Sequence, residues 1–187
     1  MNKKITVGIL ALQGAFALHQ TMLESLGVKT KLVKTRSDFD ELDAIVIPGG
    51  ESTVLNKLLD LSDLKEFLFE KILNGLFAFG TCAGLILLSQ NKEILNCEVQ
   101  RNAYGTQKDS FLATIKLIPN GKESNVAFIR APKIIKFADG AESFASYNGE
   151  VVGVISNYAM GVTFHNEVTN DDILHRFFVD KIKQRLA

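Results

Sequence analysis

The sequence has no excess of charge of either sign. Its 21 basic and 21 acidic side chains cancel, and neither kind forms a long run. A protein that binds nucleic acid or an anionic membrane usually carries a basic patch, so this balance argues against both partners. No segment approaches the roughly 18 uninterrupted apolar residues that a membrane-spanning helix needs. We therefore expect a small molecule or another protein as the partner, with no nucleic acid and no membrane.

Cysteine is also scarce, because the chain has only Cys82 and Cys97. Two cysteines cannot make a disulfide framework, and no group of cysteines and histidines has the spacing of a zinc site. This composition best fits a reducing, cytoplasmic setting. Cys97 alternates with Leu95 and Val99. That alternation predicts a buried core position for Cys97.

The amino-terminal stretch MNKKITVGILALQGAFAL shares some features with a secretory signal peptide, namely two lysines, an apolar stretch and the triplet Ala-Phe-Ala at 15–17. Gln13 interrupts the apolar stretch, however, and the β-branched residues of 5–9 alternate as in a strand. Gly14 and the helix-forming residues after it then complete a strand, a turn and a helix. We expect this segment to belong to the folded domain.

A chain of 187 residues fits a single domain, 1–187, that can bury a substantial core. Its first half alternates strand-like apolar runs with segments of helical pattern. Such alternation predicts an α/β fold, with a mostly parallel sheet and helices on both faces. Ligands of such sheets bind beyond the carboxyl ends of the strands. The expected strands are 5–10, 29–33, 44–47 and 76–79, and the expected helices are 14–26, 51–59, 64–73 and 83–89.

From about residue 94 to residue 164 the pattern changes to short β-rich stretches separated by turn residues, such as the hairpin signal Asn148-Gly149. We expect these stretches to form antiparallel strands that extend the sheet. Thr169 has the character of an N-cap and would open a terminal helix. That helix would turn its apolar side towards the core. Its buried residues would be Ile173, Phe177, Phe178 and Ile182.

The stretch FAFGTCAGLILL (77 to 88) interrupts an apolar run with Gly-Thr-Cys-Ala-Gly. We interpret it as a buried strand, a sharp turn and a buried helix, with Gly80 and Gly84 relieving the crowding of the turn. This is the arrangement of a nucleophile elbow, with Cys82 in place of serine. The N-terminus of the following helix would favour the thiolate, which is the nucleophilic form. From these residues alone, a small unreactive core cysteine fits about equally well.

A cysteine nucleophile needs a base, and the chain has three histidines. His19 falls on the apolar face of the first helix and His175 at the edge of the apolar face of the last, so we expect both to be structural. His165 ends a predicted strand, and Glu167 follows two positions later, which places both side chains on one face of an extended chain. Glu167 could then orient the imidazole towards the thiolate, as in a catalytic triad. A solvated strand end remains the alternative for this pair.

Attack on a carbonyl group also requires hydrogen-bond donors for the oxyanion. The elbow predicts one donor, the backbone N–H of Ala83. The turn Gly49-Gly50 predicts a second, the backbone N–H of Gly50, because no side chain blocks a close approach there. The structural alternative is a tight turn, with Glu51 merely favouring the N-terminus of a helix. Both turns are expected at the same edge of the sheet.

Six motifs of the chain carry a resemblance to a known family. They are LALQGAF (10 to 16), IPGGEST (47 to 53), FGTCAG (79 to 84), RNAYGTQKDSF (101 to 111), FIRAP (128 to 132) and FHNE (164 to 167). In combination they resemble the glutaminase subunit of pyridoxal 5'-phosphate synthase, a branch of the class I, or triad, glutamine amidotransferases. The resemblance runs over almost the whole chain. The acid also follows the histidine, whereas in an α/β-hydrolase it precedes it.

The resemblance implies a three-layer, flavodoxin-like fold and the hydrolysis of L-glutamine to glutamate and ammonia. Cys82 would attack the side-chain amide carbon, His165 would pass a proton to the departing ammonia, and Glu167 would orient the imidazolium. The family's pattern also assigns residues to a glutamine pocket. An arginine suits such a pocket, because a guanidinium holds the carboxylate of a free amino acid with directed hydrogen bonds. The pocket residues are Gly50, Glu51, Ser52, Arg101, Ile129 and Arg130.

The resemblance further implies that this subunit uses neither a metal nor an organic cofactor. Its partner would be a synthase subunit, a (β/α)8 barrel that takes the ammonia and builds the vitamin B6 ring. The glutaminases of this family are weak alone and are activated on docking. We therefore expect the activity of this chain to depend on its partner.

Two positions depart from the family's pattern. Asn166 stands where a proline is usual, and Thr106 stands where an arginine is common. Loss of the proline should loosen the placement of His165.

Three alternative functions also stay open. The first is a glutaminase that feeds another synthase, such as one of histidine or purine synthesis. The second is a non-catalytic regulatory subunit, and the third is a cysteine hydrolase or redox-stress protein of related fold.

Overall fold

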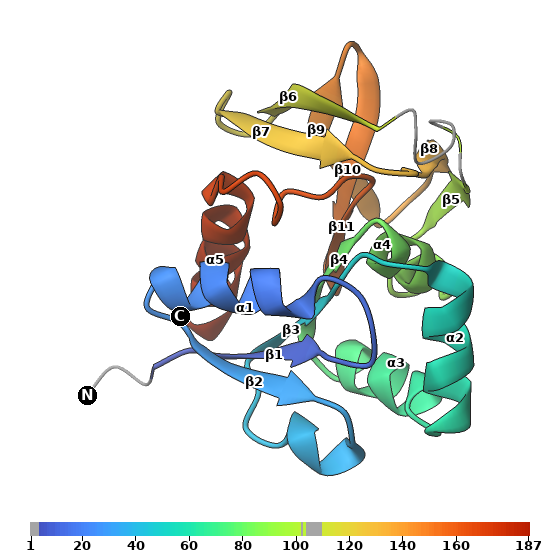
Figure 1. The fold of residues 1–187 in the computed structure, drawn as a ribbon, viewed down its shortest axis with the longest axis vertical. Coiled ribbons are helices and arrows are strands. Elements are labelled where there is room, and N and C mark those ends of the chain that lie inside the picture. Colours follow the sequence, from blue (N-terminus) through green and yellow to red (C-terminus); the bar gives the residue numbers. More distant parts are fainter. Residues whose placement is uncertain (1–3, 102, 104–109) are drawn as a thin grey trace.

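The computed structural model describes residues 4–101, 103 and 110–187. Most of the described strands join in one nine-stranded sheet of order β2-β1-β3-β4-β11-β10-β9-β6-β7, while β5 and β8 pair separately (Figure 1). Within this part of the chain, no helix has the length and apolar character that crossing a bilayer requires. The elements are β1 (Thr6–Leu10), α1 (Phe16–Ser25), β2 (Lys29–Val33), the 3-10 helix η1 (Arg36–Phe39), β3 (Ala44–Ile47), α2 (Ser52–Leu61), α3 (Lys65–Leu73), β4 (Phe77–Thr81), α4 (Ala83–Leu88), β5 (Cys97–Gln100), β6 (Phe111–Leu117), β7 (Glu123–Phe128), β8 (Lys133–Phe137), β9 (Ala141–Tyr147), β10 (Glu150–Ser156), β11 (Ala159–Val162) and α5 (Ile173–Leu186).

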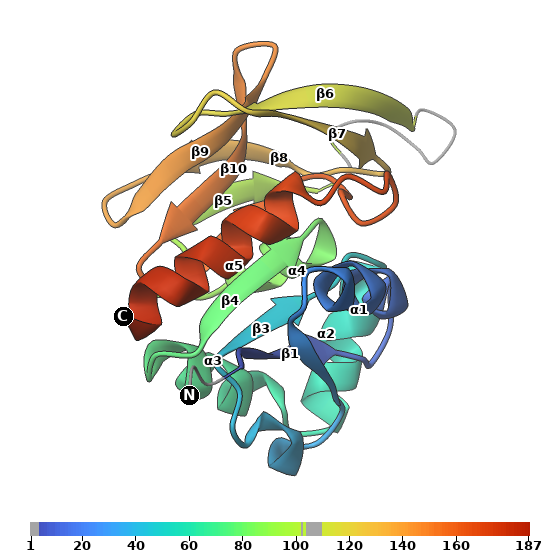
Figure 2. The ribbon, with the colours of Figure 1, turned by 90° about the vertical axis from the view of Figure 1, so that its left-hand side faces the viewer.

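The parallel half of the sheet consists of apolar strands covered on both faces. β2, β1, β3 and β4 pair in parallel, and β1, β3 and β4 are buried along their whole length. Alternate residues of a strand point to opposite faces. In β4, Phe77 and Phe79 pack with the apolar side chains of α1 and α5, whereas Ala78 packs on the side of α2, α3 and α4. Figures 1 and 2 show these two helical layers, and the expected three-layer α/β fold is confirmed.

The second half of the sheet is antiparallel, with two differences from expectation. β10 pairs with β11 and β9, and β6 pairs with β9 and β7, all antiparallel. β11, which overlaps the stretch GVTF, also lies parallel to β4, because the hairpin with β10 returns the chain in the direction of β4. β8, from the stretch KIIKFA, pairs with β5 outside the main sheet. Alternation of apolar and polar residues indicates which face of a strand is buried, but it does not indicate which strand it pairs with.

The terminal helix α5 begins at Ile173, and the prediction that Thr169 caps it is wrong. The Thr169 hydroxyl donates instead to the backbone carbonyls of Asn125, at 2.6 Å, and Asn166, at 2.9 Å. Asp171 accepts from the N–H of Ile173 at 3.0 Å and from the N–H of Asn125 at 2.8 Å. The segment before α5 is therefore tied to β7 first, and the helix starts only after that connection is made.

Three neighbouring parallel strands bring the predicted chemistry to one edge of the sheet. β3 leads into the turn of Pro48, Gly49 and Gly50, β4 ends immediately before Cys82, and β11 leads to His165. These strands adjoin in the order β3, β4, β11. Their carboxyl ends point the same way, so the turn, the cysteine and the histidine meet where ligands of parallel sheets bind.

Candidate active site

Cys82 alone makes the turn between β4 and α4. β4 ends at Thr81 and α4 begins at Ala83. The φ of 47° and ψ of −98° at Cys82 lie outside the regions that L-residues ordinarily adopt. Its N–H donates to the carbonyl of Val162 in β11 at 2.9 Å, and its carbonyl accepts from the N–H of Ile86 in α4 at 3.2 Å. Strain held in place this way is a feature of nucleophile elbows, and an inert core cysteine does not need it.

Cys97 provides an internal contrast. It lies in β5 with 1% of its surface exposed, as its alternation with apolar neighbours predicts. Burial raises the pKa of its thiol to about 11 and outweighs the opposing charge of Lys92. Cys97 is therefore a thiol at neutral pH, and the thiol is the unreactive form.

Two glycines allow α4 to approach the strands closely enough to form the elbow. A Cβ at Gly84 would lie 2.1 Å from the carbonyl oxygen of Ile47, and a Cβ at Gly80 would lie 2.5 Å from the carbonyl carbon of Gly84. Both contacts are with backbone atoms, which cannot swing aside as a flexible side chain can. The position of Cys82 thus depends on the absence of side chains on either side of it.

We expect Gly84→Ala to lower the free energy of unfolding by about 3 kcal/mol, because the added methyl must push α4 away from β3. Urea unfolding of the two proteins measures the difference. Gly140→Ala is the matched control, since Gly140 has a φ of +88° but nothing within 4 Å of its added Cβ. Backbone strain alone should cost that variant about 1–2 kcal/mol. Equal losses in both variants would contradict the importance of close approach at Gly84.

His165 and Glu167 form a buried pair beside the elbow, with Nδ1 of His165 2.7 Å from Oε1 of Glu167. Burial by itself would lower the pKa of His165, but hydrogen bonds to Cys82 and Glu167 raise it to about 10. Burial by itself would raise the pKa of Glu167, but His19 and His165 lower it to about 2. The carboxylate stays ionised and holds Nδ1, which leaves Nε2 of His165 for Cys82. With 8% and 4% of their surfaces exposed, the two residues do not form a solvated strand end.

Backbone contacts fix the position of the imidazole. The N–H of His165 donates to the carbonyl of Ala127 in β7 at 2.8 Å, and the N–H of Ala127 donates back at 2.9 Å. On its other side, His165 lies against Gly49, where a Cβ would come within 2.3 Å of Cε1 of the imidazole. The end of β7 and the Gly49-Gly50 turn therefore position the histidine together.

A cavity of about 230 Å³ opens between Cys82 and His165. It is smaller than the roughly 300–1,000 Å³ of pockets for drug-sized ligands, which suits a molecule the size of an amino acid. All six residues that the sequence assigned to a glutamine pocket line it. Ala83 and Glu167 do not line it, because Ala83 follows Cys82 into α4 and Glu167 is buried against His165. The lining residues are Gly50, Glu51, Ser52, Cys82, Ile86, Arg101, Ile129, Arg130 and His165.

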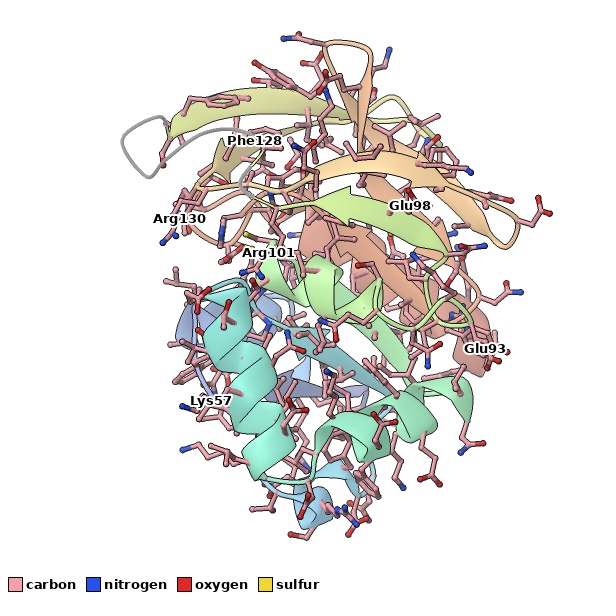
Figure 3. The ribbon with its side chains drawn as sticks, turned by 90° about the vertical axis from the view of Figure 1, so that its right-hand side faces the viewer. Lys57, Glu93, Glu98, Arg101, Phe128 and Arg130 are labelled. Atoms are coloured by element: carbon pink, nitrogen blue, oxygen red, sulfur yellow. The ribbon has the colours of Figure 1, made fainter. Side chains whose placement is uncertain are left out.

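The charged side chains that line the cavity come from separate segments of the chain, because Arg101 follows β5, Arg130 follows β7 and Glu51 precedes α2. Figure 3 shows Arg101 and Arg130 on the same side of the molecule, near the end of α2. Arg101 donates to the hydroxyl of Thr53 at 2.9 Å and lies 3.7 Å from Oε1 of Glu51. Glu51 itself caps α2, since its carboxylate accepts the N–H groups of Thr53 and Val54, and these bonds lower its pKa. The Glu51 side chain thus has the capping role that the sequence left as an alternative.

The Gly49-Gly50 turn is held from both sides. The carbonyl of Gly49 accepts the N–H of Ala15 at 3.1 Å, and its N–H donates to the Thr81 hydroxyl at 2.8 Å. The N–H of Glu51 donates to Oε1 of Gln13 at 3.2 Å. Because the carbonyl and the next N–H of a trans peptide point in opposite directions, the N–H of Gly50 points away from Ala15. The segment after β1 therefore sets the orientation of this predicted oxyanion donor.

His19 and His175 are buried and hydrogen-bonded, as the sequence predicts. Nδ1 of His19 lies 2.8 Å from Nε2 of His175, and neither residue is exposed. Asn166 joins them, with Nδ2 2.8 Å from Nδ1 of His175. Its side chain is completely buried. The prediction that Asn166 loosens His165 did not take this hydrogen bond into account. The bond to His175 restrains the side chain of Asn166, whereas a proline would restrain the backbone.

The buried histidines predict how stability depends on pH. Burial lowers the pKa of His175 to about 3, far below the ordinary 6.5. Below pH 6.5 an unfolded chain protonates this residue and the folded protein does not, so stability falls as pH decreases towards 3. Between about pH 5.5 and 4, one such histidine contributes about 1.4 kcal/mol per pH unit. We expect His175→Gln to reduce the slope of unfolding free energy against pH by about this amount in urea titrations. An unchanged slope would contradict a neutral, buried His175.

The chain belongs to the SNO glutamine amidotransferase family, whose model matches residues 9–184. Pyridoxal 5'-phosphate synthase subunit PdxT of Thermosipho africanus (strain TCF52B) is 40% identical over 188 aligned positions, and the alignment covers 95% of this chain and 99% of that one. The subunit of the same name from Francisella tularensis subsp. tularensis (strain WY96-3418) is 44% identical over 179 residues, or 92% and 97% of the two chains. The resemblance to the glutaminase subunit of pyridoxal 5'-phosphate synthase is confirmed.

Solved structures agree with the family. A crystal structure of a glutamine amidotransferase superposes with a TM-score of 0.87 at 33% identity, covering 95% of this chain and 98% of the other. The structure of PurLQS from Thermotoga maritima gives a TM-score of 0.67 at 14% identity, covering 88% of this chain and 89% of the matched one. At that identity the second likeness shows the fold alone. The class I glutamine amidotransferase fold expected from the sequence is confirmed.

Two residues of the site were not predicted from the sequence. Ile86 lines the cavity one helical turn after Cys82, a spacing that indicates the same helix face. Gln13 lies in the motif LALQGAF, but nothing in the motif shows that it contacts Glu51.

Thr106, the second departure from the family's pattern, lies outside the described residues. Among those described, no group of three or more histidine, cysteine or acidic side chains is arranged to hold a metal ion.

Proposed function

We propose that this protein hydrolyses L-glutamine to L-glutamate and ammonia through a triad of Cys82, His165 and Glu167. One observation carries the proposal: a cysteine on a strained elbow shares a cavity with a histidine whose other ring nitrogen is held by a buried carboxylate. Such a set can generate a thiolate and return its proton to a leaving group. Membership of the glutamine amidotransferase family supports an amide as the reacting group.

In the first half of the reaction, the thiolate of Cys82 attacks the side-chain amide carbon of glutamine and forms a C–S bond. The backbone N–H groups of Ala83 and Gly50 would stabilise the charge on the amide oxygen. The imidazolium of His165 gives its Nε2 proton to the amide nitrogen, the C–N bond breaks, and ammonia leaves. Glu167 stabilises the imidazolium and keeps its ring in place.

In the second half, a water molecule attacks the thioester. His165, now neutral, accepts a proton from the water at Nε2, and the C–S bond breaks to release glutamate and the Cys82 thiolate. One glutamine and one water give one glutamate and one ammonia, without any change of oxidation state. The same imidazole acts as acid and then as base, so its hydrogen bond to Glu167 serves both steps.

The cavity supports a free amino acid as the substrate. Arg101 and Arg130 line it and would hold the α-carboxylate with charge-assisted hydrogen bonds. Arg130 has a φ of +48°, a left-handed conformation uncommon for a residue with a Cβ, and such strain concentrates at binding sites. Gly50, Ser52 and Ile129 would contact the rest of the substrate, and Glu51 would act mainly by capping α2.

The relatives are named as subunits of pyridoxal 5'-phosphate synthase. We propose that this chain likewise passes ammonia to a synthase subunit, a (β/α)8 barrel, for vitamin B6 synthesis in the cytoplasm. Docking of the synthase would raise the glutaminase rate, so that ammonia is released only where it is used. The balanced charge of the chain supports a protein partner rather than nucleic acid or a membrane.

The deciding experiment measures glutamate released from L-glutamine by the purified chain, alone and with a pyridoxal 5'-phosphate synthase subunit, with Cys82→Ala as the control. We expect a release that depends on Cys82 and rises when the synthase is added. Cys82-dependent release that is indifferent to this synthase would reassign the ammonia to another pathway. No release under either condition would overturn the proposed glutaminase.

A further inference from the structure

A chain of buried side chains runs from Asn166 to the carboxylate of Glu167. Nδ2 of Asn166 lies 2.8 Å from Nδ1 of His175, and Nε2 of His175 lies 2.8 Å from Nδ1 of His19. Nε2 of His19 then lies 3.3 Å from the Thr81 hydroxyl and 3.6 Å from Oε2 of Glu167. All of these side chains are buried. The proposed reaction uses none of His19, His175 and Asn166.

The second oxygen of the Glu167 carboxylate requires a donor. Oε1 is bonded to Nδ1 of His165. Oε2 is buried, and within the described residues it has no hydrogen-bond partner at normal distance. An ionised carboxylate is costly to bury unless hydrogen bonds reach both of its oxygens. Nε2 of His19, at 3.6 Å, faces this oxygen and can supply the proton.

The hydrogen bonds that link these buried side chains can run in two directions, because a neutral imidazole carries one proton on one of its two nitrogens. In the first, the Asn166 amide donates to Nδ1 of His175, and Nε2–H of His175 donates to Nδ1 of His19. Nε2–H of His19 then points at Glu167. In the second direction the Asn166 amide is turned so that its oxygen accepts from Nδ1–H of His175, the remaining donors are reversed, and a lone pair on Nε2 of His19 faces the carboxylate.

Charge favours the first direction. A lone pair facing an ionised carboxylate is repelled, and an N–H is attracted, both strongly in a low-dielectric interior. The Asn166 amide nitrogen, not its oxygen, lies beside His175, as the first direction requires. The Thr81 hydroxyl has two lone pairs, so it can accept from Nε2–H of His19 as well as from the N–H of Gly49, and its position is compatible with the first direction. Burial lowers the pKa of both His19 and His175, so each carries a single proton at neutral pH.

We propose that His19 is a positioning residue for Glu167: its Nε2–H holds Oε2 of the carboxylate, and Asn166 sets the His19 tautomer through His175. This inference rests on the proposed function, because His19 acts only through the acid of the proposed triad. The carboxylate is then held at both oxygens, which fixes the direction in which it meets His165. A proline at this position has no side-chain donor and could not set these tautomers.

The first test reads the tautomers directly. In the complete chain labelled with 15N in histidine, long-range 1H–15N correlation spectra separate protonated from unprotonated ring nitrogens. At pH 7 we expect His19 and His175 to be neutral and both protonated at Nε2, with assignments from the spectra of His19→Gln and His175→Gln. A proton on Nδ1 of His19, or on both of its nitrogens, would overturn the inference whether or not the chain hydrolyses glutamine.

The second test uses two replacements of similar size. The amide of His19→Gln can present an N–H near the former Nε2, whereas that of His19→Asn reaches only the former Nδ1. For glutamate release with the synthase present, we expect kcat of His19→Asn to fall about tenfold, with KM unchanged, and that of His19→Gln to stay within about threefold of the unchanged protein. Urea unfolding of both variants separates this effect from a loss of folded protein.

The outcomes keep the inference apart from the proposed function. If the unchanged protein releases glutamate and His19→Asn matches it in kcat, the inference fails and the glutaminase stands. If both variants lose the same activity and the same stability, His19 is structural and the inference also fails. If the unchanged protein releases no glutamate, the proposed function fails. The tautomer spectra still decide the direction of the hydrogen bonds between Asn166 and Glu167. Should His19→Asn not fold, the spectra and His19→Gln carry the test.

Discussion

Cys82→Ala is expected to reduce glutamate release by at least roughly 10⁴-fold while the protein stays folded. Without the sulfur no thioester forms, and a loss of this size corresponds to about 5 kcal/mol of barrier. The fold should tolerate the change, because alanine keeps the Cβ that fits the elbow and removes one buried sulfur atom. The measurement is glutamate release in the presence of the synthase subunit, with circular dichroism to verify folding.

Cys97→Ala is the matched control, since it removes the same atom from the other buried cysteine. It should retain near-normal kcat even where it lowers stability. A chloroketone analogue of glutamine extends the comparison: mass spectrometry should find it on Cys82 and not on Cys97, whose raised pKa keeps it a thiol. Labelling of both cysteines at equal rates would contradict a specifically activated Cys82.

Glu167→Gln is expected to have the next largest effect, a decrease in kcat of roughly 10³–10⁴-fold with little change in KM. A glutamine at this position can donate an N–H to Nδ1 of His165, which moves the imidazole proton to Nε2. With its single proton on Nε2, the neutral imidazole can neither take the proton of the Cys82 thiol nor accept a proton from water in the second half of the reaction. This is the wrong-tautomer effect known from the buried acid of serine protease triads.

The matched control is Glu98→Gln, which makes the same change at an exposed position in β5 (Figure 3). It should leave kcat and KM unchanged. A second readout is the rate at which iodoacetamide alkylates Cys82 as a function of pH. In Glu167→Gln the reactive fraction at neutral pH should fall, because the imidazolium beside the thiolate is no longer stabilised. A normal alkylation profile would show that Glu167 does not act through His165.

The sequence predicted most of the fold because its signals are local. The alternation of strands and helices located the layers, and the glycines around Cys82 indicated the elbow. The six pocket residues came from motifs, and the structure places all of them around one cavity. Each of these conclusions depends on residues close together in the chain or on a whole motif.

What escaped prediction depends on contacts between distant segments. Thr169 has the composition of an N-cap, but its hydroxyl bonds to Asn125 in β7. The strand β8 has ordinary alternation, and nothing local directs it to β5. Asn166 was judged by the proline it replaces, whereas its side chain is bonded to His175. No local pattern reports such partners, because a side chain's hydrogen bonds are decided by what the fold brings beside it.

The parallel pairing of β4 with β11 also bears on how the chain matures. The elbow is made near the middle of the sequence, but the strand that holds the N–H of Cys82 and leads to His165 is nearly the last to be synthesised. Pairing of such distant strands is a late and slow event in folding. In the proposed mechanism, a nascent or partly folded chain therefore carries Cys82 without its base. The proposed hydrolysis of glutamine would then begin only when the sheet is complete, and an unfinished molecule would not consume glutamine.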